Sequence, residues 1–286
     1  MTPELLVETP VWDRAPVLPT FDLLGLQESP RTGQYRFDVR PDLSTPFGFL
    51  YGGTGIAASI EAAERMTDRP LQWITTQFIG SPSPGSVVEL QVTVPAEGRV
   101  TTQSQVQATV DGEPVFTSLC AHTIRPGGDG AAFVSMPDVP PPDDSPAMGG
   151  PFEMDLSGSF FRTMERRLAA GTFGMEAVGK PQHGGLSIWT RVVDDEIGSP
   201  ASQAYVADII PMGIGAALGA LPGATSIDNT LRVIDTEPTE WVLLELIPEG
   251  FHRSIGHGSL RMWSEDGRLL SIAQQTCIIR TSHHNR

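Results

Sequence analysis

An aspartate in an apolar setting, Asp208, is the residue of this sequence best suited to acid–base chemistry. It lies in the stretch AYVADIIPMG, flanked by Val206, Ile209 and Ile210. A carboxyl group that is shielded from water keeps its proton to a higher pH, which makes it a general base near neutrality. The same residue could instead cap a helix, because Asp is a favoured N-cap and Pro211 follows near the first turn. The sequence leaves both roles open.

Two adjacent glutamines near the end of the chain form the second candidate site. Gln274 and Gln275 interrupt SIAQQTCIIR (271–280), which is otherwise typical of a β-strand. Side chains alternate along a strand, so only one of the two amides faces the interior. Gln275 shares its face with Ala273, Cys277 and other apolar residues, whereas Gln274 shares one with Thr276 and Arg280. We therefore expect Gln275 to be buried, where its amide needs hydrogen-bond partners.

The chemistry that these residues favour is attack by water rather than by a side-chain nucleophile. The sequence has no G-x-S-x-G elbow, and none of its six histidines stands in a motif beside a nucleophile. No His, Cys or carboxylate spacing typical of a metal site recurs, so we expect no metal and no cofactor. A carboxylate that activates water remains the simplest interpretation.

Composition limits the partners and the location of the protein. The 286 residues are 40% hydrophobic and 19% charged, which is typical of a globular chain. The formal net charge of −15 argues against nucleic acid or an anionic membrane as a partner. No apolar run has the roughly 20 residues of a spanning helix, and the N-terminus lacks the pattern of a signal peptide. With only Cys120 and Cys277, no disulfide framework is indicated, and we expect a cytoplasmic protein.

The elements that position the candidates fall into two similar halves. A segment dense in Pro, Gly and Asp, residues 126–151, reads as a linker between an N-terminal unit (1–125) and a C-terminal unit (152–286). Each half shows a strand, then a small-residue helix, then a run of antiparallel strands. One helix is predicted over 54–68, with Thr54 as its cap, and the other over 202–221.

The strands predicted for the two halves follow a similar order. In the first half they are 35–40, 72–80, 86–94, 99–110 and 114–125; in the second half they are 186–193, 226–234, 240–247, 257–263 and 268–280. DGEPVFTSLCAHTIR (111–125) aligns without a gap on DGRLLSIAQQTCIIR (266–280), which places Gln275 opposite Cys120. The order and the alignment indicate a tandem duplication. The fold class expected is α+β: a double hotdog, in which each copy wraps a curved antiparallel sheet around a central helix.

Four stretches in this layout resemble the bacterial double-hotdog acyl-CoA thioesterases of the thioesterase II type. They are LYGGTGIAASIEAA, AYVADIIPMG, GATSIDNTLRV with EWVLLEL after it, and WSEDGRLLSIAQQTCIIR. Their order and spacing carry the resemblance, which covers most of the chain and is weakest over 152–185. The resemblance implies an enzyme that hydrolyses a fatty or related acyl-CoA to a free acid and CoA.

The resemblance also implies the catalytic residues. The aspartate of the family falls on Asp208 and its glutamine on Gln275. The family has Thr immediately before Ile-Asp, where this chain has Ser226, with Thr225 one residue earlier. Serine still binds water but is less constrained in χ1; without the resemblance, Ser226 reads as a polar residue that begins a strand.

Substrate contacts and rival residues complete the expectations. Gly52 and Gly53 could offer backbone N–H groups to an oxyanion or could form a simple turn before the helix. Asp228, on the same face as Ser226 by strand alternation, and Glu61, which reads as part of a solvated helix face, are lesser candidates for the base. Thr225 is a further candidate for contact with the substrate. CoA phosphates could be bound by His252, Arg253 and His257, although a polar turn is the alternative. An acyl tunnel could be bordered by Met154, Phe160, Phe161 and Met164, although core or linker packing is the alternative.

Three functions therefore follow from the sequence. The first is an acyl-CoA thioesterase; the second is a double hotdog that binds acyl-CoA or aryl-CoA without turnover. A hotdog hydratase is a third, but Gly213 rather than a histidine lies five residues after Asp208. Because Gln275 replaces Cys120, we expect one competent site per chain, in the second half. One chain supplies both hotdogs, so a monomer suffices, and a homodimer also fits the fold.

Overall fold

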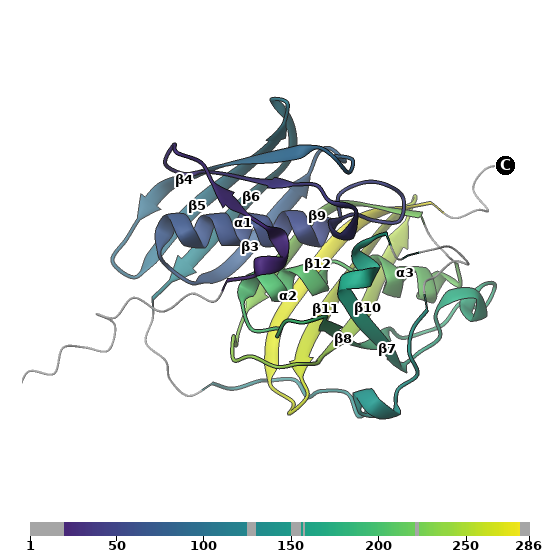
Figure 1. Ribbon diagram of the computed structural model, residues 1–286. Helices are drawn as coiled ribbons and strands as arrows, with labels where there is room; N and C mark the ends of the chain where they lie inside the picture. The colour runs from purple at the N-terminus through teal and green to yellow at the C-terminus, as the bar shows by residue number, and fades with distance from the viewer. Residues whose placement is uncertain (1–19, 125–129, 150–155, 157, 221–222, 281–286) are drawn as a thin grey trace, which may run out of the picture.

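The computed structural model describes residues 20–124, 130–149, 156, 158–220 and 223–280. Within this part of the chain, twelve strands form one continuous antiparallel sheet in the order β1-β2-β4-β5-β6-β3-β9-β12-β11-β10-β8-β7. Three α-helices lie against this sheet (Figure 1). They are α1 (Gly52–Thr67), α2 (Pro200–Ala207) and α3 (Ile210–Leu218).

The strands divide equally between the two halves of the chain. The first six are β1 (Gln27–Glu28), β2 (Gln34–Asp38), β3 (Leu71–Phe78), β4 (Val87–Glu97), β5 (Thr101–Val110) and β6 (Glu113–Thr123). The last six are β7 (Met164–Ala170), β8 (Leu186–Val192), β9 (Gly223–Val233), β10 (Val242–His252), β11 (Ile255–Ser264) and β12 (Leu269–Arg280). Each half wraps its strands around its own helices, which confirms the double hotdog (Figure 1). Strands β1 and β7 were not predicted.

The halves meet along two contacts. Strands β3 and β9 pair antiparallel from Trp73 opposite Arg232 to Gln77 opposite Asp228, so the two sheets become one. On the inner side, α1 packs against α2. Tyr51 donates its hydroxyl to the carbonyl oxygen of Tyr205 at 2.9 Å across this helix contact. The start of α1 is thereby fixed next to the second half.

The predicted second helix is two helices, and Pro211 explains the break. Proline has no N–H to donate, and its ring would clash with the carbonyl of Ala207, four residues earlier. Accordingly α2 ends at Ala207 and α3 begins at Ile210, with Pro211 in its first turn. Asp208 is the C-cap residue of α2, and the N-cap of α3 is Ile209, which makes no side-chain capping bond. The N-cap role considered for Asp208 is therefore wrong.

The start of α1 also differs from expectation. The helix begins at Gly52, and its N-cap residue is Tyr51, which makes no side-chain capping bond. Thr54 lies inside the first turn and donates its hydroxyl to the carbonyl of Leu43 at 3.0 Å. Thr54 thus anchors the preceding loop to the helix and does not cap it.

The described part of the linker covers the outer face of the second half of the sheet. A separate apolar cluster on this face is made of Trp189, Trp241, Leu243, Trp263 and Leu269, and Met136 and Val139 of the linker pack on it. The indole N–H of Trp189 donates to the carbonyl of Pro140 at 2.8 Å. The Pro-rich segment is consequently a cover for a tryptophan-rich surface as well as a connection.

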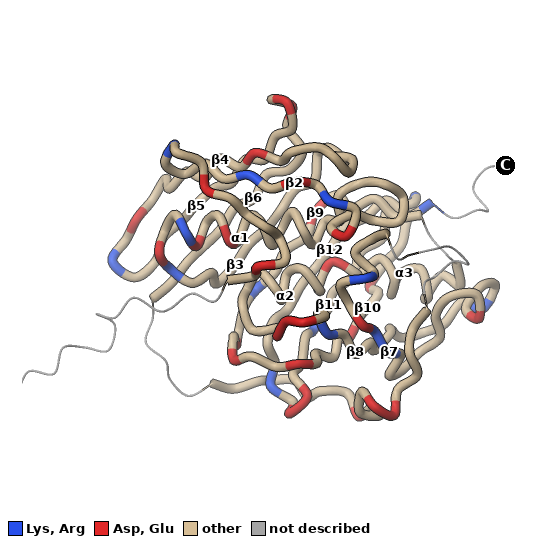
Figure 2. Tube along the Cα trace, in the orientation of Figure 1, with Lys and Arg blue, Asp and Glu red and all other residues tan. Residues whose placement is uncertain are grey.

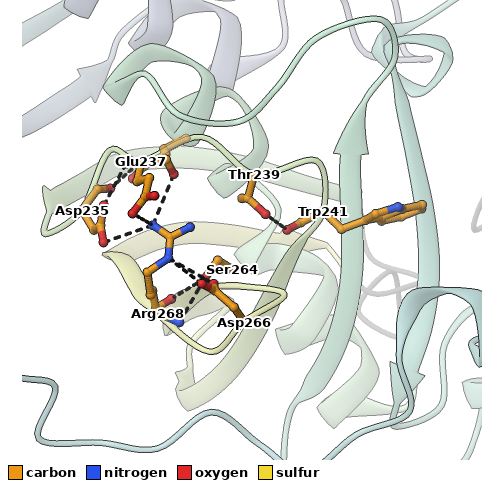
Figure 3. A network of polar contacts seen from close by, with 8 residues as sticks. Asp235, Glu237, Thr239, Trp241, Ser264, Asp266 and Arg268 are labelled. Carbon is orange, nitrogen blue, oxygen red and sulfur yellow. Dashed lines mark hydrogen bonds and ion pairs between the residues drawn. The ribbon is translucent and has the colours of Figure 1, made fainter.

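A polar network closes the end of the second half (Figure 3). The guanidinium of Arg268, the residue before β12, forms ion pairs with Asp235, Glu237 and Asp266 at 3.0 to 3.3 Å. The hydroxyl of Ser264 accepts the backbone N–H of Arg268 at 2.9 Å. This network ties the β9–β10 connection to the β11–β12 turn.

Candidate active site

A cavity of about 200 Å³ lies at the junction of the two halves. Its lining comes from the loop before α1, the end of β3, the segment around Phe160, the α2–α3 break and the start of β9. Seven aromatic residues contribute to it: Phe47, Phe49, Tyr51, Phe78, Phe160, Phe161 and Phe173. Asp208 is the one carboxylate among the lining residues. The cavity is therefore an apolar chamber with a single acidic group.

The carboxylate of Asp208 is held by three N–H donors. Its Oδ1 accepts the amide N–H groups of Gln275 at 2.6 Å and of Asn229 at 3.0 Å. The backbone N–H of Gly53, at the start of α1, also hydrogen-bonds the carboxylate. The helix break turns the side chain toward these donors, which come from β12, β9 and the other half of the chain.

Burial makes Asp208 a base suited to neutral pH. The residue is 8% exposed, and this burial raises the pKa of its carboxyl group to about 7, although the hydrogen bonds from Asn229, Gln275 and Gly53 oppose the rise. No described Lys, Arg or His forms an ion pair with it. A carboxylate of this kind ionises near pH 7 and then accepts a proton readily.

The two glutamines differ as strand alternation predicts. Gln275 is buried and Gln274 is exposed. The Nε2 of Gln275 donates both to Asp208 and, at 2.7 Å, to the hydroxyl oxygen of Ser226. Its Oε1 is buried and has no hydrogen-bond partner within the described structure. Ser226 accepts from the amide, which leaves its own hydroxyl proton free to be donated.

Asn229 is the site residue to which the sequence analysis gave no role. A β-bulge lies between two register pairs, Thr276 with Asp228 and Cys277 with Ser226, so that Ile227 is unpaired. The extra residue reverses the alternation after Ser226 and turns Asn229 inward, opposite Gln275. An amide in the middle of a strand was the available signal, as it was for Gln275.

The same bulge removes Asp228 from the site. Its carboxylate accepts the backbone N–H of Thr276 at 2.8 Å and lines a shallow outer hollow with Thr75 and Gln77. The expectation that Asp228 shares a face with Ser226 is wrong, because period-two spacing fails across a bulge.

The two glycines before the first helix have different environments. Gly52 lines the cavity, and a Cβ built on it would lie 2.4 Å from Oδ2 of Asp208. Its N–H belongs to the first turn of α1, and no described residue accepts it. The N–H of Gly53 is already engaged by Asp208. Only glycine allows the backbone to approach the carboxylate this closely.

The remaining candidates are dispersed. Thr225 lines the cavity, and its hydroxyl accepts from Arg280 at 2.7 Å. The sequence analysis expected Glu61 on a solvated helix face, but the structure buries it. Its carboxylate accepts the N–H of Phe21 at 2.7 Å and pairs with Arg65, and the residue does not line the cavity. His252, Arg253 and His257 lie in the β10–β11 hairpin, which extends further than predicted.

The residues expected to border an acyl tunnel do not all lie at the cavity. Phe160 and Phe161 line the cavity, whereas Met164 is buried in the core. Met154 lies outside the described residues.

The corresponding place in the first half has no carboxylate–amide pair. Cys120 is buried opposite Ile74, and burial raises the pKa of its thiol to about 12. Its neighbour Ser104 hydrogen-bonds Nε2 of His122 at 2.8 Å, and burial lowers the pKa of that histidine to about 4. None of these residues lines the cavity described above, whose one carboxylate is Asp208.

Two family models match the chain. The model of the acyl-CoA thioesterase N-terminal domain matches residues 41–123, and that of the C-terminal domain matches residues 136–279. A search of curated proteins finds no match.

Several solved structures are similar to this protein over most of the chain. A proposed thioesterase from Novosphingobium aromaticivorans is 29% identical, covers 89% of this chain and 98% of its own, and has a TM-score of 0.78. The fold is shared by a hot dog protein from Alicyclobacillus acidocaldarius, which is 21% identical, covers 90% of this chain and 96% of its own, and has a TM-score of 0.78. It is also shared by acyl-CoA thioesterase II TesB2 from Mycobacterium marinum, which is 18% identical, covers 90% of this chain and 96% of its own, and has a TM-score of 0.71. The two matched domains together cover most of both hotdogs and the residues that hydrogen-bond Asp208, and the chain belongs to the family of acyl-CoA thioesterases.

Proposed function

We propose that this thioester hydrolase cleaves acyl-CoA by water attack, with Asp208 as the general base. The observation that carries the proposal is the buried carboxylate at the wall of an aromatic cavity, fixed by two amides and a helix N–H. The family of the chain supports acyl-CoA as the substrate class. The cavity takes the acyl group, and CoA remains toward solvent.

The mechanism has two proton transfers. Water beside Asp208 donates a hydrogen bond to the carboxylate and accepts one from the hydroxyl of Ser226. Asp208 removes a proton as the water oxygen attacks the thioester carbonyl carbon, and the carbonyl oxygen becomes an oxyanion. The carbon–sulfur bond then breaks, and the proton held by Asp208 passes to the CoA sulfur. The products are the free acid and CoA.

The backbone at the start of α1 stabilises the oxyanion in this proposal. The N–H of Gly52 has no described acceptor, and the residue lines the cavity, where the positive end of the helix favours negative charge. Gln275 has the positioning role: its Nε2 holds the carboxylate and Ser226 together through two hydrogen bonds. Its unpaired Oε1 is the acceptor toward which a water would be drawn.

Release of free thiol from acyl-CoAs of increasing length tests the proposal. We expect Asp208→Asn to lower kcat/KM by about 10²–10⁴-fold, because the base is lost while its size is kept. Gln275→Ala should lower it as well. The matched control is Asp228→Asn, which alters a nearby carboxylate on the opposite face and should leave the rate close to wild type.

Two results would refute parts of the proposal. Turnover in Asp208→Asn equal to wild type would exclude Asp208 as the base. Binding of acyl-CoA without any thiol release, for every chain length, would favour the alternative of a non-catalytic acyl-CoA-binding or aryl-CoA-binding protein.

A further inference from the structure

Arg166 is a buried cation without a carboxylate partner among the described residues. It lies on β7 with its side chain turned inward, and the residue is 6% exposed. Its Nη1 contacts the sulfur of Met212 at 3.9 Å, and its guanidinium carbon lies 3.9 Å from the centre of the Phe161 ring. Its Nε is buried and has no hydrogen-bond partner in the described part of the chain. A thioether and a ring replace little of the hydration that burial removes.

Arginines of the second half that are partly buried are paired with carboxylates. Arg167, the next residue, contacts Glu165 at 2.9 Å, and Arg191 contacts the same carboxylate at 2.7 Å. Arg268 has three carboxylates around it. These three side chains are more exposed than Arg166 and need a counter-ion less. The described arginines of this half that form no ion pair are exposed to water, except Arg166, which is buried.

Arg166 lies directly behind the wall of the active-site cavity. Both residues that it touches, Phe161 and Met212, line the cavity. The rings of Tyr51 and Phe160 stack at 3.9 Å, and those of Phe160 and Phe161 follow at 4.3 Å, so the guanidinium ends a row of lining rings. Contact with the ring does not use the N–H donors of a guanidinium, and the unpaired Nε is available for an anion.

The position suits the far end of a short acyl group. Met212 lies in the first turn of α3, four residues after Asp208, and both residues line the cavity. The cavity volume, about 200 Å³, is smaller than the roughly 300–1,000 Å³ of sites for drug-sized ligands. Methionine is unbranched and flexible, so the Met212 side chain can move aside and expose the guanidinium to the cavity.

We infer that Arg166 binds a second carboxylate at the distal end of the acyl group, and that the preferred substrates are short dicarboxylic acyl-CoAs. The inference rests on the proposed function, because it places the thioester at Asp208. A carboxylate meets the fork of the guanidinium with two hydrogen bonds and supplies the charge that the cavity wall lacks. Arg166 is thus a specificity-determining residue.

Hydrolysis of two six-carbon substrates tests the inference. Adipoyl-CoA and hexanoyl-CoA have equal chain length and differ in the distal carboxylate. We expect wild type to prefer adipoyl-CoA in kcat/KM by about tenfold or more, and Arg166→Met to remove that preference. Hexanoyl-CoA turnover should stay within about threefold. Arg167→Met is the matched control, since it removes the neighbouring, outward-facing arginine and should preserve the preference.

A wild-type ratio of one or less, or a ratio unchanged in Arg166→Met, would overturn the inference. Should Arg166→Met fail to fold, Arg166→Lys keeps the charge without the fork, and the wild-type ratio decides by itself. If neither six-carbon substrate is cleaved, the proposed function is decided by the series of other chain lengths, and calorimetric binding of both thioesters still tests Arg166. Tighter binding of adipoyl-CoA that depends on Arg166 would support its role, and equal affinities would refute it.

Discussion

The pKa of Asp208, raised to about 7 by burial, sets the expected pH dependence of catalysis. The base acts only when ionised, so kcat/KM should be constant well above pH 7 and fall about tenfold per pH unit well below it. Initial rates of thiol release between pH 5 and 9 measure this. Asp228→Asn should show the same profile as wild type. A rate that stays constant from pH 8 down to pH 5 would contradict the assignment.

The same ionisation should destabilise the folded protein at high pH. The pKa of Asp208 is raised in the folded state relative to its ordinary value of 3.8, so folding favours the protonated form. This contribution to stability is fully present below pH 4 and is lost as pH rises through about 7, at about 1.4 kcal/mol per unit of pKa shift. Asp208→Asn should therefore melt at a higher temperature than wild type at pH 8. Near pH 4 the difference should shrink; a lower melting temperature at pH 8 would contradict this.

Residues of the site are predictable where a local pattern decides their placement. The apolar neighbours of Asp208 indicate its burial, and strand alternation separates Gln275 from Gln274. For Asp228 and Asn229 the same alternation predicts the wrong faces, because a bulge at Ile227 shifts it by one residue. A bulge depends on how two strands pair, and that information is spread over distant parts of the chain.

At the scale of elements, the break between α2 and α3 is a feature that the sequence alone did not predict. Pro211 indicates a helix start in the sequence, but its conflict with the carbonyl of Ala207 also ends the preceding helix. The resulting break is what places Asp208 against α1. The strand β7 escapes prediction because its segment carries Arg166 and Arg167 side by side and shows no simple alternation.

Gly53 gives a prediction about the contact of α1 with α2. Alanine has the higher helix propensity by about 1 kcal/mol, which alone would make Gly53→Ala stabilising. A Cβ at this position would, however, lie 2.5 Å from the carbonyl oxygen of Tyr205 and 2.5 Å from the Tyr51 ring. We expect the clash to dominate and to destabilise the protein by about 1–3 kcal/mol.

Urea unfolding of Gly53→Ala measures this effect. Gly250→Ala is the control, because a Cβ there meets no atom within 4 Å. Thiol release should also fall in Gly53→Ala, because relief of the clash would shift the backbone N–H that holds Asp208. Equal or greater stability than wild type would show that the helices separate without loss.

At the scale of the molecule, both halves contribute residues to the candidate site. The first half provides Gly52, Gly53 and most of the aromatic lining, and the second provides Asp208, Ser226 and Gln275. Acidic and basic residues are distributed over both halves of the described structure (Figure 2). The two halves thus share one fold, while the buried carboxylate that lines the cavity belongs to the second half.

Because the site is shared, neither half should be active alone. We expect the fragment 129–286 to release no thiol from acyl-CoA, since the N–H groups of α1 and the pairing partner of β9 are absent. Mixing it with the fragment 1–128 should restore turnover by re-forming the β3–β9 pair and the α1–α2 contact. A fragment 1–128 that carries Gly53→Ala should restore less, which separates specific assembly from a general solubilising effect. Full activity of 129–286 by itself would show that the second hotdog contains the whole reaction centre.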